Sequence, residues 1–239
     1  MGIGAAGVAP IFFRYIEHNA MPIIRTSDGS HTVLSEQYGV TYHSRHGAVT
    51  ESAHIFINAG LRYKAAIQRE IAILETGFGT GLNGFMTWLE ADRRNLNVHY
   101  TALELFPVSM EYLVQFDYST ALNVSERQPD FVMLHETAWE QAVALNENFT
   151  LEKRRETIEF FRRPDSFDLI YFDAFAPQAQ PELWTVEVLA NMYESLRPDG
   201  VLVTYCAQGA FKRNLKKVGF TVERLQGPPG KREMTRGNK

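Results

Sequence analysis

One nine-residue segment constrains the fold of this chain more than any other. It reads Glu75-Thr76-Gly77-Phe78-Gly79-Thr80-Gly81-Leu82-Asn83, follows an apolar run at 71–74 and precedes a helical pattern that starts at residue 82. Three glycines at alternate positions let the backbone approach a ligand closely, and the helix N-terminus behind them offers N–H groups. The segment therefore predicts a small-molecule cofactor site in the first half of an α/β fold; the alternative is a tight turn without a ligand.

From residue 71 onward, strand and helix patterns alternate. The predicted strands are 71–75, 98–103, 149–154, 167–172, 201–205, 220–225 and 232–235. The predicted helices are 48–61, 82–94, 107–116, 139–145, 181–196 and 210–218. This order predicts a Rossmann-like α/β fold with a mainly parallel sheet. The last two strands follow each other too closely for a crossover helix, so we expect them to pair antiparallel.

We expect three regions along the chain. Residues 1–22 form a poorly ordered N-terminal segment, residues 23–69 a hairpin with a helical cap, and residues 70–239 the Rossmann-like core. The hairpin follows from two short apolar runs around the turn Ser27-Asp28-Gly29-Ser30. A chain of 239 residues, of which 45% are hydrophobic, can bury one ordinary core.

Composition and charge limit the function classes. The single cysteine, Cys206, allows no intramolecular disulfide and fits a reducing compartment such as the cytosol. No apolar run reaches the ~18 residues that a membrane helix needs, and the histidines show no metal-ligand spacing. The net charge is −4, yet residues 211–239 carry nine Lys or Arg against two Glu. That basic end predicts an anionic partner; the alternative is a solvated tail.

The spacing within the glycine segment bears on the identity of the cofactor. It matches neither the dinucleotide fingerprint nor a phosphate loop, which argues against NAD and ATP. Glu75 would repel a phosphate but could accept hydrogen bonds from an ammonium group. Glu104 ends the second strand, 27 positions after Gly77, where an acid commonly accepts both ribose hydroxyls; the alternative is a surface carboxylate. An adenosine and an ammonium without phosphate indicate S-adenosyl-L-methionine.

Ten residues are therefore expected to contact this cofactor. They are Glu75, Gly77, Phe78, Gly79, Gly81, Leu82, Asn83, Glu104, Glu156 and Thr157. The last two follow the third strand, where a polar side chain could read the adenine amino group.

An acidic residue also ends the fourth strand. Asp173 opens the segment Asp173-Ala174-Phe175-Ala176-Pro177, and ligands of open α/β sheets sit beyond the carboxyl ends of the strands. An acid there can orient an amine and accept its proton, while Phe175 and Pro177 offer an apolar wall for a planar base. The alternative is a helix cap for the segment after Pro177. Asp168 begins the same strand at the opposite end, so we expect a structural role for it.

Several motifs, in their order and spacing, together resemble one family. They are Glu75 to Asn83, Tyr171 to Pro177, Trp184, Arg197-Pro198-Asp199-Gly200 and Gly230-Lys231-Arg232-Glu233-Met234. The family is that of the tRNA wobble-uridine methyltransferases: the methyltransferase half of the bifunctional MnmC enzyme and its stand-alone MnmD relatives. The resemblance runs from about residue 38 to residue 237. Within it, Tyr42 to Phe56 resembles the family's N-terminal region, which caps the cofactor site.

The resemblance implies a class I methyltransferase fold and a cytoplasmic enzyme of tRNA modification that uses S-adenosyl-L-methionine. The implied acceptor is 5-aminomethyl-2-thiouridine at wobble position 34 of the tRNA anticodon loop. The implied product is 5-methylaminomethyl-2-thiouridine.

The sequence departs from the family in two respects. Thr157 stands where the family usually carries an acid, so either Glu156 substitutes for that acid or the adenine contact is lost. The flavin-dependent oxidase domain of the bifunctional form is missing before the chain ends at Lys239. We therefore expect methylation without removal of a carboxymethyl group, and a separate oxidase or another enzyme that supplies the aminomethyl precursor.

The resemblance also implies roles for single residues. Asp173 is the expected catalytic residue, because it can hydrogen-bond the acceptor amine and orient it. The residues expected to wall the flipped wobble base are Phe175, Ala176 and Pro177. The basic residues expected to contact tRNA phosphates are Lys212, Arg213, Lys216, Lys217, Lys231 and Arg232. Glu233 would brace one of them or contact the substrate.

Two other functions remain open from the sequence. A methyltransferase or aminopropyltransferase acting on a small-molecule amine would share the ribose-binding acid, but it gives no reason for the basic end. A non-catalytic adenosyl-binding module would bind the cofactor without transferring its methyl group.

Overall fold

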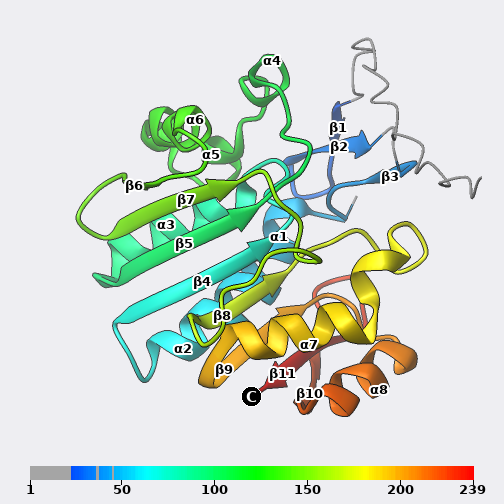
Figure 1. The fold of residues 1–239 in the computed structure, drawn as a ribbon. Coiled ribbons are helices and arrows are strands. Elements are labelled where there is room, and N and C mark those ends of the chain that lie inside the picture. The colour runs from blue at the N-terminus through cyan, green and yellow to red at the C-terminus, as the bar shows by residue number, and fades with distance from the viewer. Residues whose placement is uncertain (1–22, 36–37, 45) are drawn as a thin grey trace, which may run out of the picture.

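The computed structural model describes residues 23–35, 38–44 and 46–239, which form two β-sheets with helices around the larger one (Figure 1). The predicted N-terminal segment at 1–22 lies outside the described residues. The larger sheet has the strand order β10-β11-β9-β8-β4-β5-β7-β6. Its strands are β4 (Glu70–Thr76), β5 (Asn97–Leu103), β6 (Ala142–Ala144), β7 (Phe149–Arg154), β8 (Phe167–Phe172), β9 (Leu196–Thr204), β10 (Thr221–Gln226) and β11 (Glu233–Asn238).

Strands β4 and β8 lie side by side and mark the switch point of this sheet. β4 pairs parallel with β5 on one side and with β8 on the other, so the chain leaves β4 in one direction and later returns to its opposite side. β11 pairs antiparallel with β9 and with β10. The predicted parallel sheet with an antiparallel C-terminal pair is thus confirmed. Ligands of such sheets bind outside the carboxyl ends of the strands at the switch point.

Two hydrophobic cores cover the two faces of the sheet, because side chains alternate along each strand. In β4, Ile71 and Ile73 belong to one core and Leu74 to the other. The helices on the first core include α1 (Ala48–Ser52), the π-helix η1 (Ala53–Leu61), α2 (Arg62–Ala65) and α3 (Leu82–Arg94). Those on the second are α7 (Val186–Ser195) and α8 (Gly209–Val218), and Figure 1 shows α3 and α7 on opposite faces. β8 is buried along its whole length, as a central parallel strand should be.

The small N-terminal sheet consists of β1 (Ile23–Arg25), β2 (His31–Ser35) and β3 (Val40–Thr41), and its β1–β2 pair confirms the predicted hairpin. Polar contacts fix it to the core. The carboxylate of Asp28 in the hairpin turn accepts the N–H and the hydroxyl of Thr50 in α1, both at 2.9 Å. The hydroxyl of Tyr118 donates to the His31 carbonyl at 3.0 Å and lies 2.9 Å from the hydroxyl of Thr80. The small sheet is therefore anchored beside the glycine segment.

Two predicted helices differ from the structure. Residues 142–144 form the edge strand β6 instead of a helix at 139–145, because the open edge of β7 offers them hydrogen bonds. Trp139 bridges to Lys153, whose ammonium lies 4.9 Å from the centroid of the indole ring. The helix expected at 107–116 shrinks to the single turn α4 (Met110–Leu113).

Other helical boundaries also differ from expectation. The chain between β5 and β6 continues through α5 (Tyr118–Ala121), η2 (Ser125–Arg127) and α6 (Gln128–Glu136). The helix predicted at 181–196 is interrupted. A 3-10 turn, η3 (Pro181–Trp184), precedes α7, whose N-cap Thr185 accepts the N–H of Val188.

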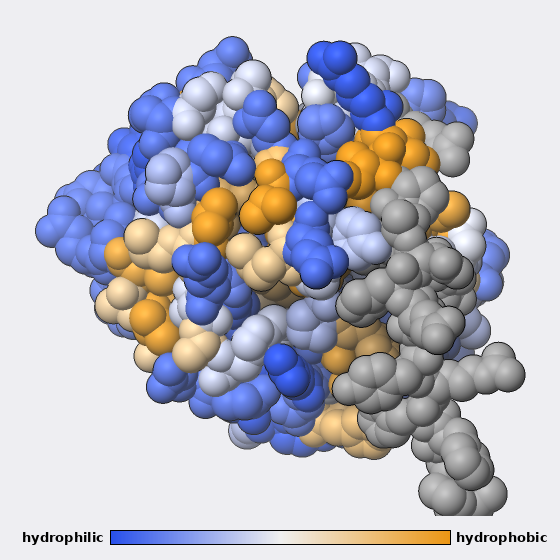
Figure 2. Space-filling view, turned by 90° about the horizontal axis from the view of Figure 1, so that it is seen from above, coloured by the Kyte–Doolittle hydropathy of each residue, from blue (hydrophilic) through white to orange (hydrophobic). Residues whose placement is uncertain are grey.

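Large apolar side chains are scattered over the surface. The exposed ones are Val40, Tyr63, Ile67, Leu105, Phe106, Val114, Met133 and Phe160. Figure 2 shows apolar side chains in small groups among hydrophilic ones on the face that is seen from above. Across residues 23–35, 38–44 and 46–239, no helix is both long and apolar enough to cross a bilayer.

Candidate functional site

A cavity opens beyond the carboxyl ends of β4, β5 and β8, at the switch point of the sheet. Its volume is about 340 Å³, within the size range of small-molecule sites. The segments that follow the strands supply most of its lining, namely 76–80, 103–106, 156–159 and 173–175. Tyr38, Tyr42 and His43 close it from the side of the small sheet.

The glycine segment joins the ends of β4 and β5. The N–H groups of Gly77 and Phe78 both donate to the carbonyl of Leu103, at 2.9 and 3.1 Å. Gly79 has a left-handed φ of 51°, and a Cβ there would lie 3.0 Å from the Cδ1 atom of Tyr42. Glycine at this position therefore lets the backbone and an aromatic ring of the cap form one wall of the cavity.

Most of the predicted cofactor residues line the cavity. They are Gly77, Phe78, Gly79, Leu82, Asn83, Glu104, Glu156 and Thr157. Gly81 and Glu75 lie behind this lining. Gly81 has a φ of 73°, and a Cβ there would lie 2.6 Å from Nε2 of His135. The glycine therefore makes room for α6 against the loop.

Two carboxyl groups share one amide beneath the cavity. Nδ2 of Asn83 donates to Oε1 of Glu75 at 3.0 Å and to Oδ2 of Asp173 at 2.8 Å. Oε2 of Glu75 and Oδ1 of Asn83 make no hydrogen bond of good geometry in the part of the chain that the structure describes, and the Tyr100 hydroxyl faces Glu75 from β5. Because Glu75 is only 1% exposed, burial raises its pKa well above the usual range, and the charge of Asp173 adds to this rise. Unsatisfied buried acceptors beside two acids form a site that suits a cationic ligand group.

Glu104 faces the cavity from the end of β5. Its Oε2 accepts the N–H of Gly79 at 3.0 Å, and its Oε1 accepts the N–H of Phe106 at 2.9 Å. Burial raises the pKa of this carboxyl group, and the backbone hydrogen bonds oppose that rise. Each carboxylate oxygen has a further lone pair, so Glu104 can also accept from the hydroxyls of a ligand.

Asp173 follows β8 and lines the cavity together with Ala174 and Phe175. Burial, assisted by the charge of Glu51, raises the pKa of Asp173 to about 7, although the Asn83 hydrogen bond and the charge of Lys231 oppose this rise. A carboxyl group with this pKa exchanges a proton near neutral pH, which suits an acid–base role.

Three aromatic rings line one side of the cavity. The ring of Phe175 lies 4.6 Å from that of Tyr38 and 5.0 Å from that of Tyr42, between centroids. The carbonyl of Phe175 accepts Nε1–H of Trp184 at 2.8 Å. The backbone N–H of Phe175 donates to Oε1 of Gln180 at 3.3 Å. The predicted wall residue Phe175 is thus held rigidly, whereas Ala176 and Pro177 lie in the turn outside the lining.

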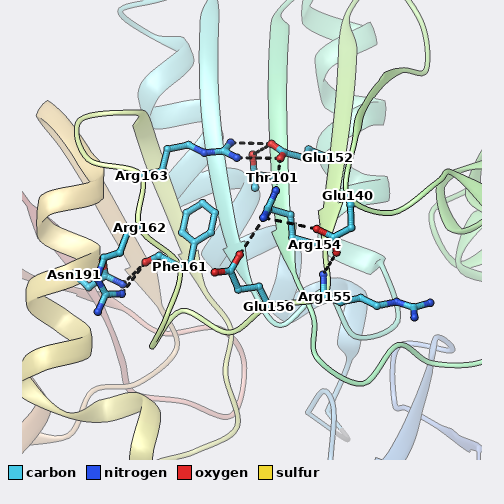
Figure 3. Close-up of polar contacts among 10 residues, drawn as sticks. All are labelled: Thr101, Glu140, Glu152, Arg154, Arg155, Glu156, Phe161, Arg162, Arg163 and Asn191. Carbon is cyan, nitrogen blue, oxygen red and sulfur yellow. Dashed lines mark hydrogen bonds and ion pairs between the residues drawn. The ribbon is translucent and has the colours of Figure 1, made fainter.

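Three side chains after β7 surround the part of the cavity where adenine recognition was expected. Oε2 of Glu156 accepts Nε–H of Arg154 at 3.2 Å, and Figure 3 shows Arg154 reaching toward Glu140 and Glu156. The hydroxyl of Thr157 donates to Oε2 of Glu159 at 3.0 Å. Glu159, which also lines the cavity, is therefore a third polar group here.

The basic C-terminal residues are divided between the interior and the surface. Lys231 forms an ion pair with Glu51, and Lys212 forms one with Glu233 at 2.7 Å. The exposed basic residues of this region are Arg213, Lys216, Lys217, Arg224 and Arg232. Neither Lys231, Arg232 nor Glu233 lines the cavity.

Sequence reasoning from single residues missed several lining residues. Those with polar or aromatic side chains include Tyr38, Tyr42, His43, Glu159, Gln180 and Glu182. The resemblance of residues 42–56 to a family cap region was the signal for part of this set. No local pattern marks Glu159 or Gln180, because the chain brings them to the cavity through loops.

Comparisons with known proteins bear on this site. Residues 134–239 match the model of a family described as S-adenosyl-L-methionine-dependent methyltransferase. The chain is 32% identical over 214 residues to the tRNA 5-methylaminomethyl-2-thiouridine biosynthesis bifunctional protein MnmC of Cupriavidus necator, covering 84% of this chain and 32% of that protein. The MnmC protein of Delftia acidovorans is also 32% identical, with 88% and 34% covered. The chain thus spans about a third of the length of these curated relatives.

Solved structures agree with the sequence comparisons. The crystal structure of MNMC2 from Aquifex aeolicus superposes with a TM-score of 0.70 at 26% identity, covering 93% of this chain and 71% of that one. Spermidine synthase from Thermotoga maritima gives a TM-score of 0.53 at 14% identity, with 92% and 69% covered. The second likeness shows the fold alone.

Proposed function

We infer that this chain belongs to the MnmC-type family of S-adenosyl-L-methionine-dependent methyltransferases, and from this premise we propose its reaction. It N-methylates the aminomethyl group of 5-aminomethyl-2-thiouridine at tRNA wobble position 34, giving 5-methylaminomethyl-2-thiouridine. One observation carries the proposal: Glu75 and Asp173 share the amide of Asn83 beneath a cavity that Glu104 also faces.

The acids of the cavity fit the polar groups of S-adenosyl-L-methionine. Glu75 would hold its ammonium group, since the unpartnered Oε2 lies beneath the cavity. Glu104 would accept from the ribose hydroxyls, and Glu159, braced by Thr157, would accept from the adenine amino group. When bound, the cofactor supplies an electrophilic methyl group.

Asp173 would serve as the catalytic residue. An aliphatic amine is mostly protonated at neutral pH, with an ordinary pKa of about 10, and an ammonium nitrogen has no lone pair with which to attack. The ionised carboxylate of Asp173 would take that proton and hold the neutral amine in place, a contribution that is typically worth about 10²- to 10⁴-fold in rate. Its pKa of about 7 keeps a large fraction ionised at neutral pH.

The rest of the acceptor would lie on the aromatic side of the cavity. Phe175, held by Tyr38 and Tyr42, would contact the wobble base, with Ala176 and Pro177 at the rim. A wobble base is unpaired, so it splays out at low cost. Phosphates of the anticodon loop would contact the exposed basic residues near the C-terminus, which makes binding salt-dependent. A tRNA substrate would place the protein in the cytoplasm, where a flavin-dependent oxidase or another enzyme would supply the precursor.

The proposed reaction is tested with purified protein, methyl-labelled S-adenosyl-L-methionine and tRNA that carries 5-aminomethyl-2-thiouridine. After digestion, mass spectrometry should find the label in 5-methylaminomethyl-2-thiouridine, and Asp173→Asn should remove it while cofactor binding, measured by calorimetry, persists. Free amines in the same assay should not compete. Labelling of free amines in preference to tRNA would instead indicate a small-molecule enzyme, and cofactor binding without any labelled product would indicate a binding module.

A further inference from the structure

An ion pair that joins distant parts of the chain lies near enough to Asp173 for both of its charges to act on that carboxyl group. Nζ of Lys231 contacts Oε1 of Glu51, which is 180 positions away in the sequence. The second oxygen of Glu51 accepts the N–H of Ser44 at 3.1 Å. The Lys231 ammonium also lies 4.2 Å from the ring centroid of Tyr205. This ammonium is therefore fixed by a carboxylate on one side and an aromatic ring on another.

The Glu51–Lys231 pair is also connected to Asp173, which follows β8. The hydroxyl of Tyr205 donates to the carbonyl of Ala174 at 2.8 Å, which ties the ring beneath Lys231 to the residue after Asp173. The charge of Lys231 lowers the pKa of Asp173 and that of Glu51 raises it. The pair thus places two opposite charges where both act on one carboxyl group.

Other polar groups also face Asp173, and each belongs to a different element. They are Asn83 of α3, Glu75 of β4, Tyr100 of β5 and Tyr205 after β9. Asn83 is neutral, burial raises the pKa values of both tyrosines, and Glu75 is a second acid. Among these groups of the described chain, Asn83 and Lys231 both favour an ionised Asp173, Asn83 through its hydrogen bond and Lys231 through its positive charge.

We propose that Glu51 and Lys231 are positioning residues for Asp173: their ion pair holds the Lys231 ammonium beside the carboxyl group, so that this half-buried acid can ionise and accept a proton. The inference rests on the proposed function. In the step concerned, one proton moves from the substrate ammonium to a carboxylate oxygen of Asp173, leaving a neutral amine and a neutral carboxylic acid. Lys231 and Glu51 keep their charges throughout. This role differs from a contact between Lys231 and a tRNA phosphate.

The direct test is a titration that needs no activity. In protein labelled with ¹³C-aspartate, the Asp173 carboxyl resonance, identified by its loss in Asp173→Asn, is followed from about pH 5 to about pH 9. Lys231→Met should raise the midpoint by about one unit, because Glu51 is left unpaired beside the acid, and Glu51→Gln should lower it by a similar amount. Lys231→Arg keeps the charge and should retain the wild-type midpoint. His43 does not interfere, because burial lowers its pKa to about 4.

A matched control is available in the last residue of the chain. Nζ of Lys239 pairs with Asp165 at 3.0 Å and lies 5.0 Å from the Tyr193 ring centroid, so it repeats the arrangement of Lys231 far from the cavity. Lys239→Met should leave the Asp173 midpoint unchanged. Unchanged midpoints in Lys231→Met and Glu51→Gln, or shifts in the same direction, would overturn the proposal.

Kinetics separate this inference from the proposed function. If the wild type methylates tRNA, the single-turnover rate of Lys231→Met at pH 7 should fall about fivefold, because a pKa near 8 leaves about a tenth of the acid ionised. The rate should recover at high pH, with unchanged tRNA affinity and salt dependence. A loss of tRNA affinity without a shift of the pH profile would assign Lys231 to phosphate binding instead. A wild type that methylates no tRNA contradicts the proposed function, while the titration still decides the inference.

Discussion

The two ends of strand β8 carry aspartates in opposite circumstances. At the amino end, Oδ2 of Asp168 accepts the N–H of Ala72 at 2.7 Å and Nη1–H of Arg197 at 3.0 Å. At the carboxyl end, Oδ2 of Asp173 accepts from Asn83, which it shares with Glu75. Burial and the charge of Glu51 raise the pKa of Asp173 to about 7.

The difference shows that the two edges of the sheet use their polar groups for different purposes. Asp168 has a cationic partner and a backbone donor, so its charge stabilises the connection between β4, β8 and β9. Asp173 has no ion-pair partner of its own within the described residues: it shares one amide with a second acid, and the nearby Lys231 ammonium is paired with Glu51. This arrangement lowers stability but prepares the site for a cationic ligand. Stability should therefore depend on the amino edge of the sheet, and chemistry on the carboxyl edge.

The largest expected effect is at the carboxyl end. Asp173→Asn keeps an oxygen for Asn83 but removes the proton acceptor, so methyl transfer should fall by about 10²- to 10⁴-fold. Single-turnover assays with labelled cofactor measure this loss, and calorimetry should show nearly unchanged cofactor binding. Near-normal turnover of Asp173→Asn would show that methyl transfer does not depend on this carboxyl group.

The opposite substitution should affect stability and spare chemistry. Asp168→Ala removes the acceptor of the Ala72 N–H and leaves Arg197 without its ion pair, which should cost about 1.5 to 3 kcal/mol of unfolding free energy. Chemical denaturation measures this, with the rate per folded molecule as the companion readout. A large loss of rate in fully folded protein would show that the amino edge also serves the reaction.

Strand β4 also carries an acid near each end, Glu70 at its amino end and Glu75 near its carboxyl end. Glu75→Gln should weaken cofactor binding by roughly 10-fold or more, because it removes the carboxyl group that is expected to ionise when it holds the ammonium group. Glu70 begins the same strand with its side chain 75% exposed, so Glu70→Gln is the matched control and should change nothing in a calorimetric titration. Equal affinities for both variants would remove Glu75 from the cofactor site.

A last effect concerns the pH dependence of stability and leaves methyl transfer aside. The pKa of Asp173 rises from 3.8 to about 7 on folding, so the folded state binds the proton more tightly and stability is lost as pH rises from about 4 to about 7. The Asp173→Asn variant has no carboxyl group at this position, so its stability does not fall in this way as the pH rises. The unfolding midpoint of Asp173→Asn, compared with that of the wild type, should therefore gain roughly ten degrees between about pH 4 and about pH 8 in thermal scans. A pH-independent difference would contradict the raised pKa.

Local sequence signals predicted the parts of the fold that local physics decides. The bounds of α3, β7 and β8 match those expected, because glycines and apolar periodicity mark them within a few residues. The rule that ligands sit at strand ends led to Glu104 and Asp173, which both line the cavity.

Features that depend on distant partners were not predictable in this way. Residues 142–144 form a strand because the edge of β7 is open to them. No pattern within residues 142–144 predicts that they pair with β7. The Glu51–Lys231 pair likewise depends on the C-terminal hairpin packing against the N-terminal cap. Sequence alone assigned Lys231 to a phosphate contact, since a lysine in a basic segment gives no sign of an internal carboxylate.

The central claim is that the carboxyl edge of this sheet methylates the wobble aminomethyl group, and wobble nucleosides from cells test it most directly. Mass spectrometry of tRNA from cells without this protein should show 5-aminomethyl-2-thiouridine in place of 5-methylaminomethyl-2-thiouridine. Wild-type protein and Asp168→Ala should restore the methylated nucleoside, and Asp173→Asn should not. Unchanged wobble nucleosides in cells without the protein, or full restoration by Asp173→Asn, would contradict the account.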